Sequence, residues 1–166
     1  MPTKAVLRSR IIRALTRSGL GANEQTDIDG YIQSIIREDL CGDHAWGFMQ
    51  RITTLPIVEG VREYGAPEIA SDLFRDINFI EIGDSVSGSS WISLEETELQ
   101  TLYEAFPDED NTNEPEVWCM FQGDRIVLGP IPDTAYVLRV HYWEYPKELG
   151  DEDSNYLTSH YPNLIL

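Results

Sequence analysis

Three apolar runs joined by two short turns fill the segment from Pro115 to Trp143, and they constrain the fold more than any other part of the chain. The runs are rich in β-branched and aromatic residues, as strands are, and cover residues 117–121, 126–128 and 135–143. Gly123 supplies the positive φ that a tight hairpin needs in the first link. The second link, Gly129 to Asp133, holds two prolines that lack an N–H donor, so we expect this corner at a sheet edge or outside the ladder. The segment predicts an antiparallel meander.

The third run has the two-residue period of a strand that is buried on one face. One face carries Tyr136, Leu138, Val140 and Tyr142, and the other carries Arg139 and His141. We therefore expect the first face in the core and the second partly in contact with water.

Two amphipathic helices are expected before the β-rich part. Residues 4–17 repeat apolar side chains every three or four positions, which is typical of one buried helical stripe. A second helix is expected to begin at Thr26 or Asp27, either of which can cap it, and to end at Gly42. These two stripes can be buried only if the helices pack on each other and on something further.

A third helix is predicted at about 93–106, because Ser93 and Glu96 have capping-box spacing and acids crowd the first turn. The acidic link from Asp108 to Glu114 is expected to be a solvated loop. Near the C-terminus, residues 153–154 can cap a short helix. The length of 166 residues suits one domain with a core of ordinary size.

Charge is unevenly distributed along the chain, whose net charge is −17. Five of the 12 basic residues lie within the first 17 positions, where no acid occurs, and they are Lys4, Arg8, Arg10, Arg13 and Arg17. The rest of the chain is therefore strongly acidic. This asymmetry indicates a basic helix that docks on an acidic protein surface, such as another copy of the chain, or that touches nucleic acid; a solvated helix face is the plainer alternative.

Cysteine content and hydropathy indicate in which cellular compartment the protein is made. Cys41 and Cys119 lie far apart in unlike contexts, so we expect two buried or half-buried free thiols. No apolar run approaches the ~20 residues of a membrane span, and residues 1–20 are too basic and too broken for a secretory signal. We expect a protein made in a cytoplasm, with no membrane partner.

Candidate chemistry is sparse. His44, His141 and His160 have no metal-ligand spacing. Asp108 and Asp110 resemble the start of a calcium loop, but the later glycine and glutamate positions do not match. No nucleophile elbow, dinucleotide fingerprint or phosphate-binding loop is present. We therefore expect no enzymatic activity, no cofactor and no metal.

Several fragments occur in an order that is fairly specific together, although each is weak alone. They are Gly60-x-Arg62-Glu63-Tyr64-x-x-Pro67, Pro115-x-x-Trp118, Ile126-x-Leu128-x-Pro130-x-Pro132-Asp133-x-x-Tyr136-x-Leu138-x-Val140-x-Tyr142, Pro146 with Leu149, and the terminal segment from Asn155 to Leu164. The chain resembles the head-to-tail adaptor (connector) proteins of tailed bacteriophages over nearly its whole length.

The resemblance implies an α+β fold: a helical bundle of two N-terminal helices and a C-terminal helix, with an inserted antiparallel β-rich region. Accordingly we expect a helical hairpin at 1–45, the insertion at 46–146, and a C-terminal segment at 147–166 that packs on the N-terminal helices. Relatives usually continue past the Tyr161-Pro162 position with a long helix, whereas the sequence stops at Leu166. Either the protein is a short member or its tail is missing from this sequence, so the resemblance does not carry over the portal contacts of that helix.

The resemblance also implies a structural role in the virion neck, in a protein made in the host bacterial cytoplasm. The expected partners are the portal protein, identical subunits in a dodecameric ring, a tail, nozzle or tail-fibre protein, and passing DNA that is not bound sequence-specifically. The five N-terminal cations are then candidates for contact with the portal or a neighbouring subunit. Candidate mobile docking loops contain Gly83, Gly88, Asp108, Asp110 and Asn113.

One alternative class fits the aromatic residues. A β-rich carbohydrate- or receptor-binding module of a phage tail would use Trp91, Trp118, Trp143 and Tyr145 as an exposed stacking platform. Core packing explains such aromatics more often, and a hydrolase lacks its nucleophile, base and orienting group.

Overall fold

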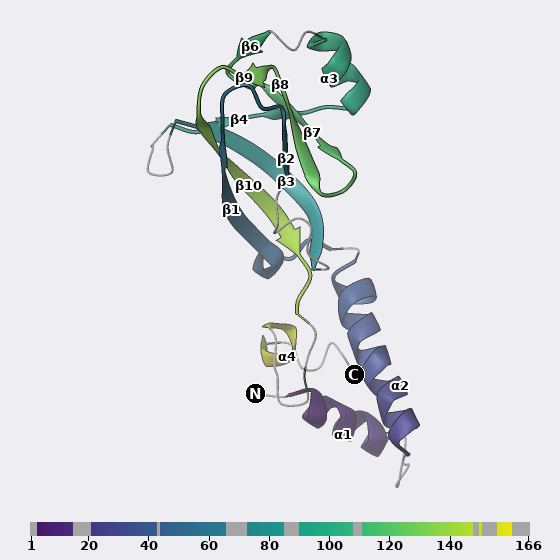
Figure 1. Ribbon diagram of the computed structural model, residues 1–166. Coiled ribbons are helices and arrows are strands. Elements are labelled where there is room, and N and C mark those ends of the chain that lie inside the picture. The colour runs from purple at the N-terminus through teal and green to yellow at the C-terminus, as the bar shows by residue number, and fades with distance from the viewer. Residues whose placement is uncertain are drawn as a thin grey trace. The chain divides into compact units, whose positions relative to one another are not determined.

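The computed structural model describes residues 3–14, 21–42, 44–65, 73–84, 90–107, 111–147, 150 and 156–160. Its contacts divide the chain into two compact units, whose elements are labelled in Figure 1. The helical unit comprises Met1–Met49 and Tyr145–Leu166, and the β unit comprises Gln50–Glu144. Helices and mainly antiparallel sheets are both present, so the predicted α+β class is confirmed. The bundle packing stays a prediction.

The helical unit begins with α1 (Lys4–Ala14) and α2 (Ala22–Ser34), which contact each other. Leu7 of α1 and Ile32 of α2 are fully buried, as their places in the two apolar stripes predict. Burial of these stripes, and not helix propensity alone, holds such short helices together.

The start of α2 differs from the prediction, because the helix begins at Ala22, before the expected caps Thr26 and Asp27. The Glu24 side chain accepts a hydrogen bond from the backbone N–H of Gly21 at 3.0 Å. An acid inside the first turn therefore satisfies a donor at the helix end and allows the earlier start.

The end of this helical segment agrees with the prediction. α2 passes directly into a π-helical turn, η1 (Ile35–Leu40), in which Ile36 is buried. Gly42 follows, and a Cβ atom there would collide with the backbone carbonyl of Glu38. Only glycine leaves room for this carbonyl at the end of the turn.

Stacked aromatic rings connect two further elements of the helical unit, the 3₁₀ turn η2 (Gly47–Met49) and α4 (Tyr156–His160). The ring centroids of Phe48 and Tyr156 lie 4.5 Å apart, and those of Tyr156 and His160 lie 4.2 Å apart. These contacts attach α4 to the segment that follows η1.

The strands of the β unit form two larger sheets and one short pair. Sheet A has the order β1–β10–β3–β4, made of Gln50–Ile57, Tyr136–Glu144, Phe74–Gly83 and Ile92–Ser93. Sheet B has the order β2–β8–β7–β5, made of Glu63–Gly65, Arg125–Gly129, Val117–Phe121 and Glu95–Glu96. β6 (Thr112–Asn113) and β9 (Ile131–Pro132) form the short parallel pair.

The main core contains side chains from both larger sheets, with β10 lying between β1 and β3 in sheet A. Its buried members are Ile57, Ile77, Ile80, Ile82, Leu94, Trp118, Ile126, Leu128, Tyr136, Leu138 and Val140. The inward face predicted for β10 is therefore confirmed.

On the opposite face of β10, His141 is more deeply buried than predicted, with 8% of its surface exposed. The Phe79 ring stacks on the imidazole with 4.0 Å between centroids, and His141 Nε2 lies 3.0 Å from Glu81 Oε2. Arg139 on the same face is half-buried, with its guanidinium 3.7 Å from the centre of the Trp91 ring. The Phe79 ring therefore keeps the expected water from His141, whereas Arg139 keeps the partial contact with water that was predicted.

The β7–β8 hairpin is confirmed, and positive φ values at Gln122 (55°) and Gly123 (81°) turn the chain. One face of the hairpin faces the main core, and the other faces α3 (Leu99–Ala105). Leu102 of α3 packs there with Cys119 and Val127. Burial on both faces explains the nearly continuous apolar runs of the hairpin strands.

The helix predicted at about 93–106 is shorter, because residues 92–93 and 95–96 are the strands β4 and β5. The backbone N–H of Glu95 donates to the carbonyl of Glu116 at 3.0 Å, in parallel pairing with β7. Sheet pairing therefore overrides the capping-box spacing of Ser93 and Glu96, and α3 begins after Glu98.

The proline-rich corner lies in the β6–β9 pair, outside sheets A and B, as predicted. Thr112 pairs with Ile131, and Asn113 pairs with Pro132. The acidic link is therefore not entirely a loop: its Thr112–Asn113 part is strand β6.

Gly129 of β8 lies close to α3 and to Phe106 at its end, since a Cβ there would lie 2.7 Å from Phe106 Cδ2 and 3.1 Å from Leu102 Cγ. We expect Gly129→Ala to displace α3 and to lower the free energy of unfolding by about 1–3 kcal/mol. Gly65→Ala is the matched control, because nothing lies within 4 Å of its Cβ position. Urea unfolding compares the two, and equal stability of both variants would contradict this packing.

We expect Tyr136 to make the β unit sensitive to alkali. Burial, together with the Asp133 carboxylate that accepts its hydroxyl hydrogen bond at 2.7 Å, raises the pKa of Tyr136 to about 12. Because this folded-state pKa exceeds the ordinary value of about 10, the stabilisation is complete below pH ~10 and is lost as the pH rises towards 12. We expect Tyr136→Phe to flatten this part of the stability profile; urea midpoints that fall in parallel for both proteins would contradict it.

Both cysteines are buried free thiols, as predicted. Cys41 follows η1, and Cys119 lies in β7 beneath α3. Burial, with a smaller contribution from the Glu63 charge, raises the pKa of the Cys119 thiol. Such a thiol is chemically inert in the folded protein.

Candidate subunit interface on helices α1 and α2

The cations of α1 lie on two different faces of the helix. Lys4 and Arg8 are one turn apart, and their side chains are only 15% and 17% exposed. Arg10 and Arg13 are exposed and lie on the side away from Arg8. The N-terminal charge is therefore divided between a contact inside the helical unit and a surface.

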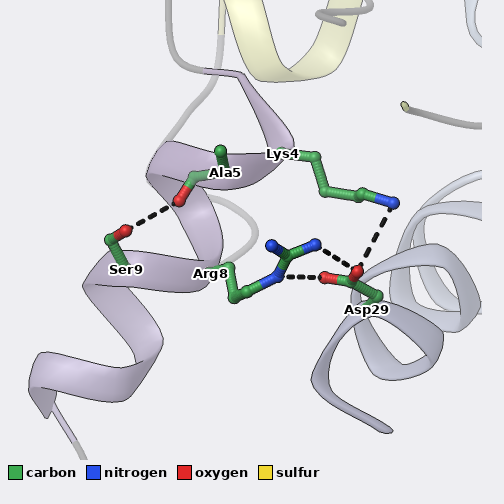
Figure 2. Close-up of polar contacts among 5 residues, drawn as sticks. All are labelled: Lys4, Ala5, Arg8, Ser9 and Asp29. Carbon is green, nitrogen blue, oxygen red and sulfur yellow. Dashed lines mark hydrogen bonds and ion pairs between the residues drawn. The ribbon is translucent and has the colours of Figure 1, made fainter. Parts of the chain in front are cut away.

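Asp29 of α2 binds both inner cations (Figure 2). Arg8 donates from Nε to Asp29 Oδ1 at 2.7 Å and from Nη2 to Oδ2, and Lys4 Nζ lies 3.5 Å from Oδ2. Two parallel guanidinium–carboxylate bonds fix orientation better than a single ion pair. The geometry fastens α1 to α2.

The titration of Asp29 reflects this contact. The hydrogen bond from Arg8 lowers the pKa of the carboxyl group below its ordinary value, partial burial opposes the shift, and the charges of Arg8 and Lys4 add to the lowering. The ionised carboxylate is consequently the form that the folded helical unit favours.

Sequence reasoning missed Asp29, although a signal for it exists. The residue lies among Ile28 and Ile32 on the buried side of α2, where an acid needs a partner. The adjacent helix supplies that partner through the cations at positions 4 and 8.

The outer cations belong to a stripe along α1. Val6, Arg10 and Arg13 follow each other at helical spacing, and all three are exposed. Within the part of the chain that the structure describes, no carboxylate forms an ion pair with Arg10 or Arg13. These guanidinium groups are available to another molecule.

Of the remaining predicted site residues, the structure describes Gly83 and Asn113, both in the β unit. Arg17, Gly88, Asp108 and Asp110 lie outside the described residues. Gly83 belongs to strand β3, not to a loop: it is buried and pairs with Val137, because the ladder with β10 extends that far. Asn113 is exposed in strand β6, and its carbonyl accepts the N–H of Asp133 at 3.3 Å.

Three of the four aromatic side chains named for the alternative interpretation are buried or covered by another side chain. Trp118 is 2% exposed within the core, the Trp91 ring is covered by Arg139, and Tyr145 lies beneath Arg37 at 5.0 Å. None of these three side chains is exposed to the degree that stacking on a sugar requires.

Among the described residues, no group of three or more His, Cys, Asp or Glu side chains is placed to hold a metal ion. No described helix is long and apolar enough to cross a lipid bilayer.

Comparison with known protein families identifies the kind of protein. The chain matches the family described as SU10 adaptor protein over residues 3–166. It belongs to the SU10 adaptor family. The match covers both the helical unit and the β unit of this adaptor, and it agrees with the resemblance seen in the sequence fragments. No curated protein matches this adaptor in a sequence search.

Proposed function

We propose that this adaptor is a structural protein of a bacteriophage virion, located in the neck between head and tail. There it forms a ring below the portal, extends the DNA channel and provides the docking surface for the tail, nozzle or tail fibre. The observation that carries the proposal is the family match over residues 3–166. A structural role requires surfaces and a stable scaffold, and no catalytic site.

The charge of the chain suits a channel for DNA. With a net charge of −17 per copy, a dodecamer carries roughly −200 charges. An acidic wall repels phosphates, so DNA passes without the counterion release that makes basic proteins bind it. We expect no retention of DNA by the purified protein at physiological salt.

The basic residues then serve two purposes. Lys4 and Arg8 orient α1 through Asp29, whereas Arg10 and Arg13 provide exposed charge for docking. We also propose that the links around Gly88 and around Asp108, with the exposed Asn113, contact the tail.

Electron microscopy of the purified protein, with and without the portal protein of the same phage, tests the proposal. We expect rings, and a ring attached to one end of the portal in the mixture. Failure to bind the portal, or turnover of a substrate by the purified protein, would overturn the proposed function.

A further inference from the structure

A shallow hollow lies on the outward face of α2, with an exposed aromatic ring beside it. The hollow has a volume of about 340 Å³ and is lined by Thr26, Asp27, Gly30, Tyr31 and Ser34. The Tyr31 side chain is 70% exposed, the highest exposure among the large hydrophobic residues that the structure describes. A Cβ at Gly30 would have nothing within 4 Å, so the space beside the ring is open.

Negative charge flanks this hollow. Asp27 lies one turn before Tyr31, and Glu38 lies one turn after Ser34, whose hydroxyl donates to Glu38 Oε2 at 3.0 Å. Both carboxylates are exposed. We call the surface of Asp27, Gly30, Tyr31, Ser34 and Glu38 the α2 face.

The α1 stripe of Val6, Arg10 and Arg13 has the complementary character. It combines one apolar side chain, 41% exposed, with two exposed guanidinium groups. Arginine binds carboxylates in a planar, two-pronged geometry and stacks on aromatic rings, so Asp27, Glu38 and Tyr31 are suitable partners for it.

The two surfaces cannot meet within one copy. The α1 stripe lies on the side of α1 away from Arg8, and the α2 face lies on the side of α2 away from Ile32, while Arg8 and Asp29 join the helices. Complementary surfaces that point in different directions on one subunit pair head to tail with copies of that subunit, and such contacts close into rings when the rotation permits.

We propose that the α1 stripe of one subunit docks on the α2 face of the next, with Arg10 and Arg13 near Asp27 and Glu38, and that this contact joins neighbouring subunits of the ring. The inference rests on the proposed function, because it specifies the ring contact of the adaptor. Its occupant is a second copy of this chain, chosen because the two surfaces have opposite charge and each has one exposed apolar or aromatic side chain.

Charge exchange tests this contact. One variant carries Arg10→Glu and Arg13→Glu, a second carries Asp27→Arg and Glu38→Arg, and a third carries all four changes. We expect each two-site variant to require about tenfold more protein for half-assembly in mass photometry or on the portal, and the four-site variant to recover wild-type assembly. Because the two-site variants move the net charge in opposite directions, a general charge effect cannot weaken both.

Mixing the two-site variants gives an independent readout. Each variant retains one native surface, and the two altered surfaces are complementary to each other. We therefore expect the mixture to form rings in which the variants alternate, with one-to-one composition in native mass spectrometry.

Tyr31 provides a test that does not depend on charge. We expect Tyr31→Ala to weaken assembly about tenfold and Tyr31→Phe to preserve it, since the exposed ring supplies the apolar centre of the contact. Tyr103→Ala is the matched control, because Tyr103 is also an exposed tyrosine, 40%, but lies on α3 of the β unit.

The outcomes separate the inference from the proposed function. Two-site variants that assemble like wild type, a four-site variant that stays defective, or particles no larger than dimers would overturn the inference. Rings that form normally but no longer bind the portal would also overturn it and would assign the α1 stripe to the portal. A wild-type protein that forms no ring, alone or on the portal, would overturn the inference and the proposed ring together.

Discussion

Trp118→Ala is expected to lower the free energy of unfolding of the β unit by about 3–5 kcal/mol, the largest loss foreseen for a single substitution in this protein. The indole is 2% exposed and packs among residues of both larger sheets, so its removal leaves a cavity between them. Urea unfolding followed by circular dichroism measures the loss.

A matched substitution checks that the position, and not the residue type, is responsible. Trp46 in the helical unit is 36% exposed, and Trp46→Ala removes the same side chain from a place near water. Equal destabilisation by the two substitutions would contradict the central position assigned to Trp118.

Asp29→Ala is expected to destabilise the packing of α1 on α2 by about 2–3 kcal/mol, because Arg8 loses both charged hydrogen bonds while its side chain stays 17% exposed. Helical circular dichroism during urea unfolding, at protein concentrations below assembly, measures the effect. Asp27→Ala is the control: it removes an exposed acid of the same helix, and a loss as large as that of Asp29→Ala would refute the orienting role of Asp29.

The same pair of variants has a pH signature. Since the pKa of Asp29 is lowered in the folded state, its contribution to stability is complete above the ordinary value of about 3.9 and disappears as the pH falls through the lowered folded-state pKa. We expect wild type and Asp27→Ala to lose this contribution in acid, whereas Asp29→Ala lacks it from the start.

The β unit could be predicted well from the segment 115–143, because two-residue periodicity and turn residues report directly on burial and chain reversal. The hairpin around Gly123 and the inward face of β10 followed from that pattern alone. His141 did not, because the Phe79 ring that shields it comes from a strand far away in the sequence.

Local helix signals were less reliable where a sheet competes for the backbone. Ser93 and Glu96 have the spacing of a capping box, yet pairing of Glu95 with Val117 keeps this segment extended. A helix cap satisfies only a few backbone N–H donors, whereas a neighbouring strand pairs with the N–H and C=O groups all along the segment. The residues of this segment alone do not indicate that strand β7 will pair with it.

At the candidate interface, the sequence indicated which residues carry positive charge, but not that these residues lie on two different faces of α1. Five basic residues within the first 17 positions look equivalent in a count, and only helical geometry separates Lys4 and Arg8 from Arg10 and Arg13. The decisive partner, Asp29, lies on another helix, so its role depends on tertiary packing.

The inaccessible thiols make the protein convenient for site-directed labelling. Cys41 and Cys119 are 0% and 2% exposed, so maleimide dyes should spare them in the folded state. A cysteine introduced at position 103, which is exposed on α3 and lies outside the α1 stripe and the α2 face, would then be the preferred attachment point for a fluorophore or cross-linker, without prior removal of the native sulfhydryls. Energy transfer between two such labels on separate copies could follow collar formation in real time.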